Sequence, residues 1–365
     1  MAKKKEKFFY RVVYDALKKE ILEGEYKYND LLPSEREISE RFQMDRATVR
    51  TALSMLVTDN LVEKKAGMGT KVIYGTEEYS ELRQRNNDNI IGFFMPKSNQ
   101  MTERITQPFY SELFFNLEGF LKAQNYSIIY TTLEDEQELQ DFIGNHGIRG
   151  AVFLSSVAPQ LLIRAKHMKF PSILVNRLDD DFTCVLGNNI DGGYTAIKHL
   201  LENEHRKIGI ISAPSSYITT QERLIGCKKA FAEYGLSMDD AIIFQGDWEY
   251  NSGVEATREI ASMEEDKRPT AIFSFNDAMA LGAIRTLHDM NLRVPQDISV
   301  IGFDNLNYLK FTEPNLTTID TQVERMAQVV GFNLMGLISG MLPMGMRIDV
   351  PTNLVERGTV MKRHG

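Results

Sequence analysis

The chain has 365 residues, which is too long for one ordinary hydrophobic core and suits two or three domains. Its hydrophobic and charged fractions, 43% and 25%, are typical of a globular protein. No apolar run approaches the roughly 20 residues of a membrane-spanning helix, and charges interrupt the stretches after the basic N-terminus, which argues against a secretory signal. We therefore expect a cytoplasmic protein in which Cys184 and Cys227 are buried free thiols rather than a disulfide.

The formal net charge of −8 is divided unevenly along the chain. Residues 1–75 contain 15 lysines and arginines against 12 acidic residues, a net charge of +3, and the remainder contains 27 against 38, a net charge of −11. A basic N-terminal part on an acidic protein is expected when only that part approaches a polyanion.

Three short helices are predicted near the N-terminus. Residues 9–22 carry apolar side chains at the spacing of one helix face, and a glycine follows them. Ser34 and Glu37 have the spacing of a capping box, which starts a second helix. Asp45 is a suitable N-cap for a third helix. The buried stripe of that third helix is then Val49, Leu53, Leu56 and Val57.

The outer face of the third helix is basic and rich in hydroxyls. Arg46 and Arg50 lie one turn apart on the same face, with Thr48 and Thr51 beside them. The N-terminus of a helix also offers free N–H groups and a positive dipole end, which suit phosphate. Two helices joined by a tight turn and led by such residues describe a helix-turn-helix, although an ordinary helical hairpin with a solvated face fits the same pattern.

The following segment, LVEKKAGMGTKVIYG, favours the first alternative. Two apolar pairs flank a glycine-containing tip, which is the pattern of a β-hairpin. Lysines surround the tip, Lys65 among them, and Gly67 and Gly69 would let the backbone pass close to a neighbouring surface. A basic hairpin directly after a helix-turn-helix is typical of a wing that contacts phosphates or the minor groove.

The run LPSEREISERFQMDRATVRTALSMLVTDNLVEKKAGMGT resembles the winged helix-turn-helix of GntR-type bacterial repressors. The resemblance implies that residues 1–75 form a DNA-binding domain. Met44 and Asp45 stand where that family usually has Val-Ser, so the charge of Asp45 would repel a phosphate there. The candidate DNA-binding residues are Arg36, Arg46, Thr48, Arg50, Thr51, Lys65, Gly67 and Gly69.

Residues 76–89 are polar and are expected to form a linker. From residue 90 onward, short apolar runs alternate with helical segments, which predicts parallel sheets covered by helices on both faces. About ten such strands are too many for one open sheet of this length, so we expect an α/β body of two doubly wound lobes.

Ligands of such sheets bind beyond the carboxyl ends of the strands. The residues directly after the apolar runs are mostly amides, hydroxyls and carboxylates, together with the only tryptophan of the chain. This set suits a hydroxyl-rich ligand, because carboxylate, amide and guanidinium groups pair with vicinal hydroxyls. Helix capping is the alternative role for Asn188, Asn276 and Asp277.

Three segments, DGGYTAIKHLLENEHRKIGIIS, ITTQERLIGCKKAFAEYGL and FSFNDAMALGAIRTLHDMNLRVPQDISVIGFDN, resemble the effector domain of LacI/GalR-type regulators, which is related to periplasmic sugar-binding proteins. The resemblance assigns residues 90–365 to an effector-binding and dimerisation domain. It implies a lobe one of about 90–186 and 317–346 and a lobe two of about 187–316 and 347–362. The implied effector-binding residues are Tyr110, Ser155, Asn176, Arg223, Trp248, Asn276 and Asp304.

The sequence contains no CxxC, HExxH, GxSxG or P-loop motif, and its six histidines do not cluster. His199 and His205 flank a helix end, where we expect surface or cap-side imidazoles. We therefore predict that the chain is not an enzyme and uses neither a cofactor nor a metal.

The predicted function is that of a homodimeric repressor of carbohydrate-utilisation genes, released from double-stranded operator DNA when a sugar or sugar derivative binds between the two lobes. The protein would be bacterial, cytoplasmic and associated with the nucleoid when bound to DNA, with no membrane partner. Two other classes fit parts of the sequence. They are a periplasmic-type solute-binding protein without DNA function and an enzyme on a two-lobed α/β body.

Overall fold

The computed structural model describes residues 9–59, 61–65, 69–74, 89–96 and 107–363, and the chain divides into two compact units, residues 1–88 and 89–365. Almost all of the predicted linker, residues 76–89, lies outside the described residues. None of the described helices is long and apolar enough to cross a membrane.

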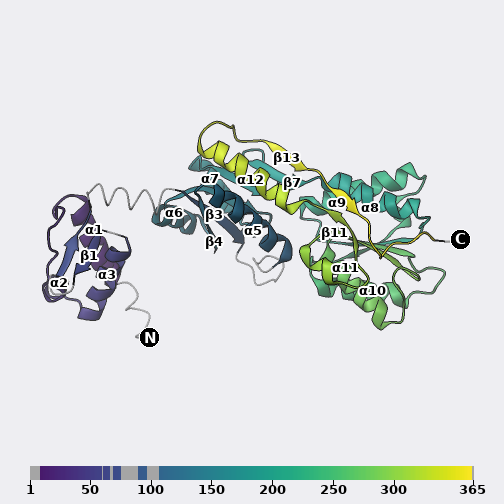
Figure 1. The fold of residues 1–365 in the computed structure, drawn as a ribbon, viewed down its shortest axis with the longest axis horizontal. Coiled ribbons are helices and arrows are strands. Elements are labelled where there is room, and N and C mark those ends of the chain that lie inside the picture. The colour runs from purple at the N-terminus through teal and green to yellow at the C-terminus, as the bar shows by residue number, and fades with distance from the viewer. Residues whose placement is uncertain (1–8, 60, 66–68, 75–88, 97–106, 364–365) are drawn as a thin grey trace. The chain divides into compact units, whose positions relative to one another are not determined.

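The described part of the first unit is three helices followed by a β-hairpin (Figure 1). The elements are α1 (Phe9–Leu22), α2 (Glu35–Phe42), α3 (Arg46–Thr58), β1 (Val62–Lys65) and β2 (Gly69–Val72). The two strands pair antiparallel, with Val62 opposite Val72. One core joins the helices, because Leu17, Ile38 and Leu53 are all buried in it. This arrangement confirms the predicted winged helix-turn-helix.

Local hydrogen bonds explain where the helices of this unit begin. The Ser34 hydroxyl accepts a bond from the Glu37 N–H at 3.3 Å, and the Glu37 carboxylate accepts one from the Ser34 N–H at 2.7 Å. Asp45 accepts bonds from the N–H groups of Ala47 and Thr48 at 2.8 and 2.9 Å. Both predicted caps are therefore confirmed, and each satisfies N–H groups that the first helical turn leaves free.

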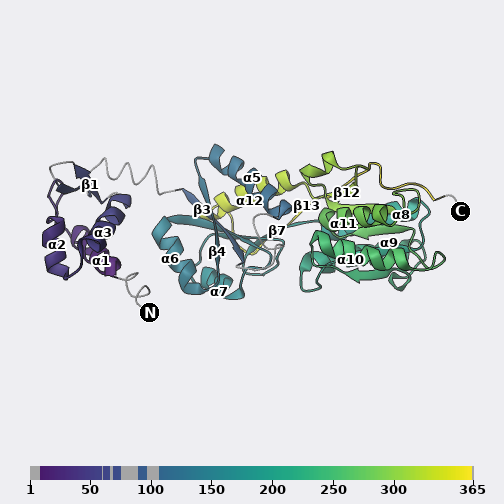
Figure 2. The same cartoon turned by 90° about the horizontal axis from the view of Figure 1, so that it is seen from below.

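Lobe one of the second unit is a six-stranded parallel sheet with the strand order β13-β7-β6-β5-β3-β4. Helices α5 and α12 cover one face of this sheet, and α6 and α7 cover the other (Figures 1 and 2). The strands are β3 (Ile90–Pro96), β4 (Ser127–Leu133), β5 (Ile148–Leu154), β6 (Ser172–Val175), β7 (Thr183–Gly187) and β13 (Arg347–Val350). The helices are α5 (Pro108–Ala123), α6 (Glu136–His146), α7 (Pro159–His167) and α12 (Val323–Ile338).

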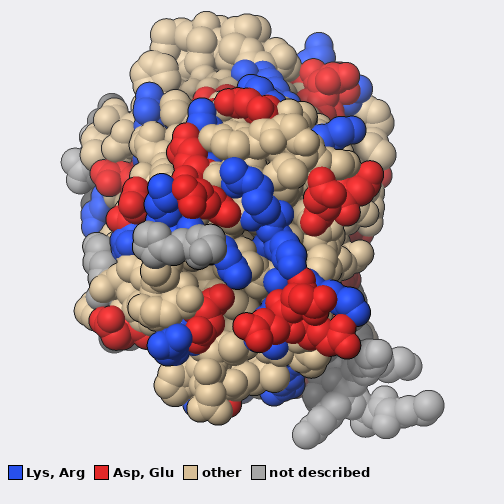
Figure 3. All heavy atoms as spheres, turned by 90° about the vertical axis from the view of Figure 1, so that its right-hand side faces the viewer, with Lys and Arg blue, Asp and Glu red and all other residues tan. Residues whose placement is uncertain are grey.

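Lobe two is a second six-stranded sheet, ordered β14-β12-β11-β10-β8-β9, in which only β14 runs antiparallel to its neighbour among the described strands. Its strands are β8 (Ile208–Ser212), β9 (Ile242–Gln245), β10 (Ala271–Ser274), β11 (Ser299–Asp304), β12 (Thr317–Asp320) and β14 (Asn353–Val355). Its helices are α8 (Asn189–Glu202), α9 (Ile218–Glu233), α10 (Tyr250–Ser262) and α11 (Asp277–Asp289), with 3-10 turns η2 (Met238–Asp240) and η3 (Asn307–Phe311). Acidic and basic side chains are interspersed on the face shown in Figure 3.

Two doubly wound parallel lobes were expected, and the α/β fold is confirmed. Two lobe assignments were wrong. Residues 317–320 were expected in lobe one, but β12 pairs with β11 in the sheet of lobe two. Residues 347–350 were expected in lobe two, but β13 pairs with β7 in the sheet of lobe one. The chain therefore crosses between the lobes after β7, after β12 and again after β13, because strand pairing within the sheets, not strand order in the sequence, decides where these strands lie.

Close packing of α8 on α9 depends on two glycines. A Cβ atom at Gly226 would lie 2.0 Å from the Ile190 carbonyl oxygen, and one at Gly193 would lie 2.3 Å from the Arg223 carbonyl oxygen. We expect Gly226→Ala to destabilise the protein by about 2–4 kcal/mol, because backbone must move to admit the methyl group. Urea unfolding measures this loss. Gly144→Ala on α6, where no atom beyond its chain neighbours and its own helix backbone lies within 4 Å of the new Cβ, should be neutral or slightly stabilising. Equal effects of the two substitutions would contradict the packing.

The burial of the two cysteines was predicted, whereas the burial of two histidines was not. Cys184 and Cys227 are buried and free, which confirms the expectation. His199 and His205 are buried, so they are not surface imidazoles, although His199 lies in the last turn of α8 and His205 just beyond its end, as the cap-side alternative expected. The ring nitrogens of His205 lie 2.9 Å from Thr270 Oγ1 and 3.1 Å from the Met361 carbonyl oxygen, which ties the C-terminal segment to lobe two.

Burial lowers the pKa of His205 to about 4 from its ordinary value of 6.5. Between these values the unfolded chain binds more protons than the folded one, so the contribution of neutral His205 is complete above pH 6.5 and is lost toward pH 4. We expect the stability difference between wild type and His205→Gln to shrink over that range, as measured by urea unfolding at pH 7, 6 and 5. Asp277, whose pKa burial raises to about 7, acts in the opposite direction, so the difference between the two proteins is the informative quantity. A pH-independent difference would refute the effect.

Candidate functional site

The candidate DNA-binding residues of the first unit lie at its solvent-exposed surface. Arg36, Arg46, Arg50 and Thr51 are exposed, and Thr48 is half-buried. Gly69 begins β2 with a φ of +95°, a conformation that favours glycine. Gly67 lies outside the described residues, and only the backbone of Lys65 is described, at the end of β1.

Glu35 holds part of this basic surface in place. Its carboxylate accepts a 2.7 Å hydrogen bond from Arg50 Nε and lies 3.5 Å from Lys64 Nζ, so it connects α2 with α3 and the wing. The hydrogen bond from Arg50 lowers the pKa of Glu35 from its ordinary value. The pair orients the Arg50 side chain. It contributes little to the stability of the folded protein, because both side chains are at least partly exposed to water.

The hydroxyls of this surface also bond within the helix. Thr48 Oγ1 donates to Asp45 Oδ2 at 2.7 Å, and Thr51 Oγ1 donates to the Ala47 carbonyl oxygen at 3.0 Å. Asp45 is thus committed to capping α3, and hydrogen bonds from Thr48 lower the pKa of its carboxyl group. The guanidinium groups are therefore the side chains of this face best placed to meet a polyanion.

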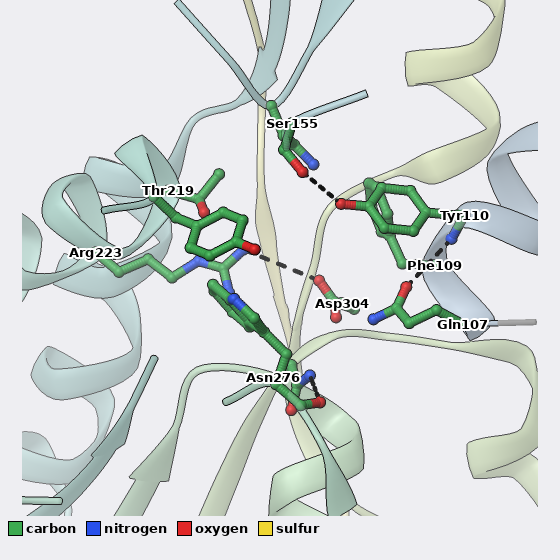
Figure 4. A pocket seen from close by; sticks show the side chains of 11 residues that line it. Gln107, Phe109, Tyr110, Ser155, Thr219, Arg223, Asn276 and Asp304 are labelled. Atoms are coloured by element: carbon green, nitrogen blue, oxygen red, sulfur yellow. Dashed lines mark hydrogen bonds and ion pairs between the residues drawn. The ribbon is translucent and has the colours of Figure 1, made fainter. Parts of the chain in front are cut away.

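The seven candidate effector residues all line one pocket between the two lobes, whose empty volume is about 510 Å³ including space open to solvent (Figure 4). Ser155, Asn176 and Asn276 follow the carboxyl ends of β5, β6 and β10, and Asp304 ends β11. The strand-end pattern thus placed them together, as parallel sheets require. Lobe one contributes Tyr110, Ser155 and Asn176, and lobe two contributes Arg223, Trp248, Asn276 and Asp304.

Four further residues line the same pocket. They are Gln107, Phe109, Tyr217 and Thr219. Tyr217 and Thr219 lie at the start of α9, whereas β8 ends at Ser212, so a rule restricted to the residues directly after each strand does not reach them. Gln107 and Phe109 lie at the start of α5, on the lobe-one side. The rings of Tyr217 and Trp248 meet edge to face, 5.8 Å between centroids, and Tyr110 Oη lies 2.6 Å from Ser155 Oγ.

Arg223 is the buried cation of the pocket. Its Nε donates to Asn189 Oδ1 at 3.0 Å, its Nη1 donates to the Phe275 carbonyl oxygen, and its guanidinium carbon lies 3.5 Å from the centre of the Phe303 ring. Burial lowers the pKa of Arg223 to about 10, which leaves it charged at neutral pH. Its Nη2 faces Asp304 Oδ1 at 4.0 Å, a separation too long for a direct hydrogen bond.

Asp304 and Asn276 complete the polar wall of lobe two. Burial raises the pKa of Asp304 well above its ordinary value, while Arg223 opposes that change. Asn276 caps α11, because its Oδ1 accepts a 2.9 Å bond from the Met279 N–H, and its Nδ2 donates to the Trp248 carbonyl oxygen at 2.7 Å. The two roles weighed for this residue therefore coexist, since the capping side chain also lines the pocket.

Comparison with known proteins identifies both units. The gntR family of bacterial regulatory proteins matches residues 9–72, and the periplasmic binding protein-like domain matches residues 197–360. The HTH-type transcriptional repressor PurR of Aliivibrio fischeri (strain MJ11) is 33% identical over 264 residues, which are 70% of this chain and 78% of that protein. The chain belongs to this family of HTH-type transcriptional repressors. It is a ligand-responsive DNA-binding regulator.

Solved structures share the fold of this regulator. A LacI family transcriptional regulator from Enterococcus faecalis V583 with bound ribose matches with a TM-score of 0.65 at 25% identity, over 76% of this chain and 100% of that chain. The lac repressor dimer bound to operator and the anti-inducer ONPF matches with a TM-score of 0.66 at 21% identity, over 79% and 99%. The combination of a GntR head with a LacI-type effector domain is confirmed, whereas the roles of the individual pocket and surface residues stay predictions.

Proposed function

We propose that the regulator represses genes of carbohydrate use and leaves its operator when an uncharged sugar binds between the lobes of the effector domain. The observation that carries this proposal is the pocket, which joins hydroxyl, amide and aromatic side chains from both lobes in a chain that also has a DNA-binding head.

The charge of the pocket favours an uncharged ligand. Arg223 and Asp304 are the charged residues among those lining it, and they have opposite signs. Arg223 Nη2 and Asp304 Oδ1 are 4.0 Å apart, so a ligand hydroxyl that bridges them from the pocket side would accept a bond from the guanidinium and donate one to the carboxylate. The indole of Trp248 would cover the apolar face of a sugar ring. A phosphate or carboxylate on the ligand would instead lie against Asp304 without a second cation to balance it.

Operator binding would use two copies of the head. A single winged head makes few contacts, so we infer a two-fold homodimer that recognises a pseudo-palindromic site. The lac repressor, whose fold this chain shares, was solved as a dimer on its operator. Arg46 and Arg50 would contact base edges or phosphates, and the wing would fix the register of the head on the duplex. Operator binding of this kind would take place in the bacterial cytoplasm.

Effector binding would act through the lobes. A ligand held by residues of both lobes favours the arrangement in which both sets of contacts form, and it shifts the lobe equilibrium only by its difference in affinity for the two arrangements, typically ~1–3 kcal/mol. The linker joins lobe one at residue 90, so a movement of lobe one would change how freely the head can move.

An anisotropy titration tests the proposal, with DNA from upstream of the protein's own coding region at two salt concentrations. It is run with and without a pool of pentoses, hexoses, disaccharides and uronates. We expect binding that weakens steeply with salt and is relieved by an uncharged sugar. Relief by uronates alone would reject the uncharged ligand. Tight binding that no sugar changes would reject the sugar, and binding no tighter than to random DNA would favour a solute-binding role.

A further inference from the structure

A buried carboxylate lies behind the effector pocket without lining it. Glu222 is on α9 in lobe two, and its side chain is 4% exposed. Its Oε1 accepts a 2.7 Å hydrogen bond from Nη2 of Arg347, which lies on β13 in the sheet of lobe one. This ion pair therefore crosses from one lobe to the other, between residues 125 positions apart in the sequence.

Asn189 connects the ion pair to the pocket. This residue begins α8, directly after the chain leaves β7 of lobe one. Its Nδ2 lies 3.3 Å from Glu222 Oε2 and 2.9 Å from the Gly187 carbonyl oxygen, and its Oδ1 accepts the 3.0 Å bond from Arg223 Nε. Hydrogen bonds thus run without interruption from Arg347 through Glu222 and Asn189 to the guanidinium of Arg223 in the pocket.

The two members of the ion pair differ in what they would lose if the lobes moved apart. Arg347 is 40% exposed and also bonds Asp349 on its own strand, at 2.8 to 3.1 Å, so it would keep a carboxylate partner and water. In the described part of the chain, the ion pair of Glu222 is the one with Arg347. A buried carboxylate that loses its cation is strongly destabilised, so the pair favours the lobe arrangement seen in this structure.

We propose that Glu222 and Arg347 are positioning residues that hold the Arg223 guanidinium in register with lobe one and set how readily the lobes separate. The inference extends the proposed function, because an effector bound to Arg223 would then be connected to the lobe that carries the linker. Its test needs no effector and no DNA, so this inference and the proposed function can fail independently of each other.

The test uses Trp248, the only tryptophan of the chain, which lines the pocket between the lobes. Quenching of its fluorescence by acrylamide in the full-length protein measures access to the pocket. Arg347→Met should raise the quenching constant about twofold or more, because the population with separated lobes increases. Arg347→Lys, which keeps the charge, should restore most of the protection.

Two further variants separate positioning from general loss of structure. Asp349→Asn removes the other partner of Arg347 but leaves the interlobe pair, so its quenching should match wild type. The quenching constant of Glu222→Gln should equal that of Arg347→Met. The constant of the double variant should be no higher than that of either single variant, because the two residues act as one unit. Urea midpoints identify variants that unfold. If Glu222→Gln unfolds, the Arg347 variants still decide the test, because Arg347 is half-exposed and its replacement is less disruptive. Unchanged quenching in Arg347→Met, or an equal rise in Asp349→Asn, would overturn the proposal.

Discussion

Alanine at position 223 should abolish the response of the regulator to its effector while leaving operator affinity without effector nearly unchanged. The side chain lines the pocket at the head of a hydrogen-bonded network, and it lies in the second unit, whereas the DNA-binding head is in the first. Loss of a charge-assisted hydrogen bond costs roughly 2 kcal/mol, so effector affinity should fall about 30-fold or more. Titration of Trp248 fluorescence with the sugar pool, beside the anisotropy assay, measures both quantities.

The control for this substitution has to separate ligand binding from stability, because Arg223 is buried and its removal takes away the cation that faces Asp304. Arg223→Lys retains the charge but not the guanidinium geometry, and thermal unfolding shows which variants remain folded. Arg285→Ala removes an exposed arginine on α11 that pairs with Asp289 and should behave as wild type. A normal response by folded Arg223→Ala would place the effector site elsewhere.

Alanine at position 50 should weaken operator binding by about 10- to 100-fold, or ~1–3 kcal/mol, with effector binding unchanged. Arg50 is 63% exposed on α3 and is oriented by Glu35, so its guanidinium can reach the DNA without rearrangement of the helix. If the contact is to phosphate, the dependence of log affinity on log salt should also become shallower by about one.

The same anisotropy assay at several salt concentrations measures the effect of Arg50→Ala, and Arg285→Ala again serves as the matched loss of one positive charge. An equal loss of affinity for the operator and for random DNA would indicate a phosphate contact, and a loss confined to the operator would indicate a base contact. Operator affinity equal to that of wild type would refute the assignment of α3 as the recognition helix.

Short-range sequence patterns predicted the DNA-binding head, because each pattern depends only on interactions between residues close together in the chain. The capping box of Ser34 and Glu37 and the cap at Asp45 involve residues three or fewer positions apart, so local geometry alone decides them. The buried stripe of α3 follows from helical periodicity, although Val57 is only partly buried. The wing could be predicted to the level of its two strands, and its tip, residues 66–68, lies outside the described residues.

The pocket was predictable for a different reason. Parallel strands bring their carboxyl ends to one edge of each sheet, so polar residues after apolar runs converge whatever the order of the strands. That rule collected Ser155, Asn176, Asn276 and Asp304, which line the pocket, but also Asn188 and Asp277, which are not among its lining residues. It could not assign β12 and β13 to lobes, because the packing of whole lobes decides strand pairing. β12 lies between β11 and β14 of lobe two, and β13 lies beside β7 at the edge of the lobe-one sheet.

The sequence by itself determined the helix caps, the buried faces, the alternation of strands and helices and the polar groups at the strand ends, because each depends on residues close together along the chain. Only the tertiary structure decided which sheet each strand joins, where the chain crosses between the lobes, and which side chains distant in the sequence come into contact. Arg347 and Glu222 have no local pattern that pairs them, and their contact exists because β13 returns to the sheet of lobe one beside α9 of lobe two. Long-range pairing depends on the packing of whole lobes, and short stretches of sequence do not encode it.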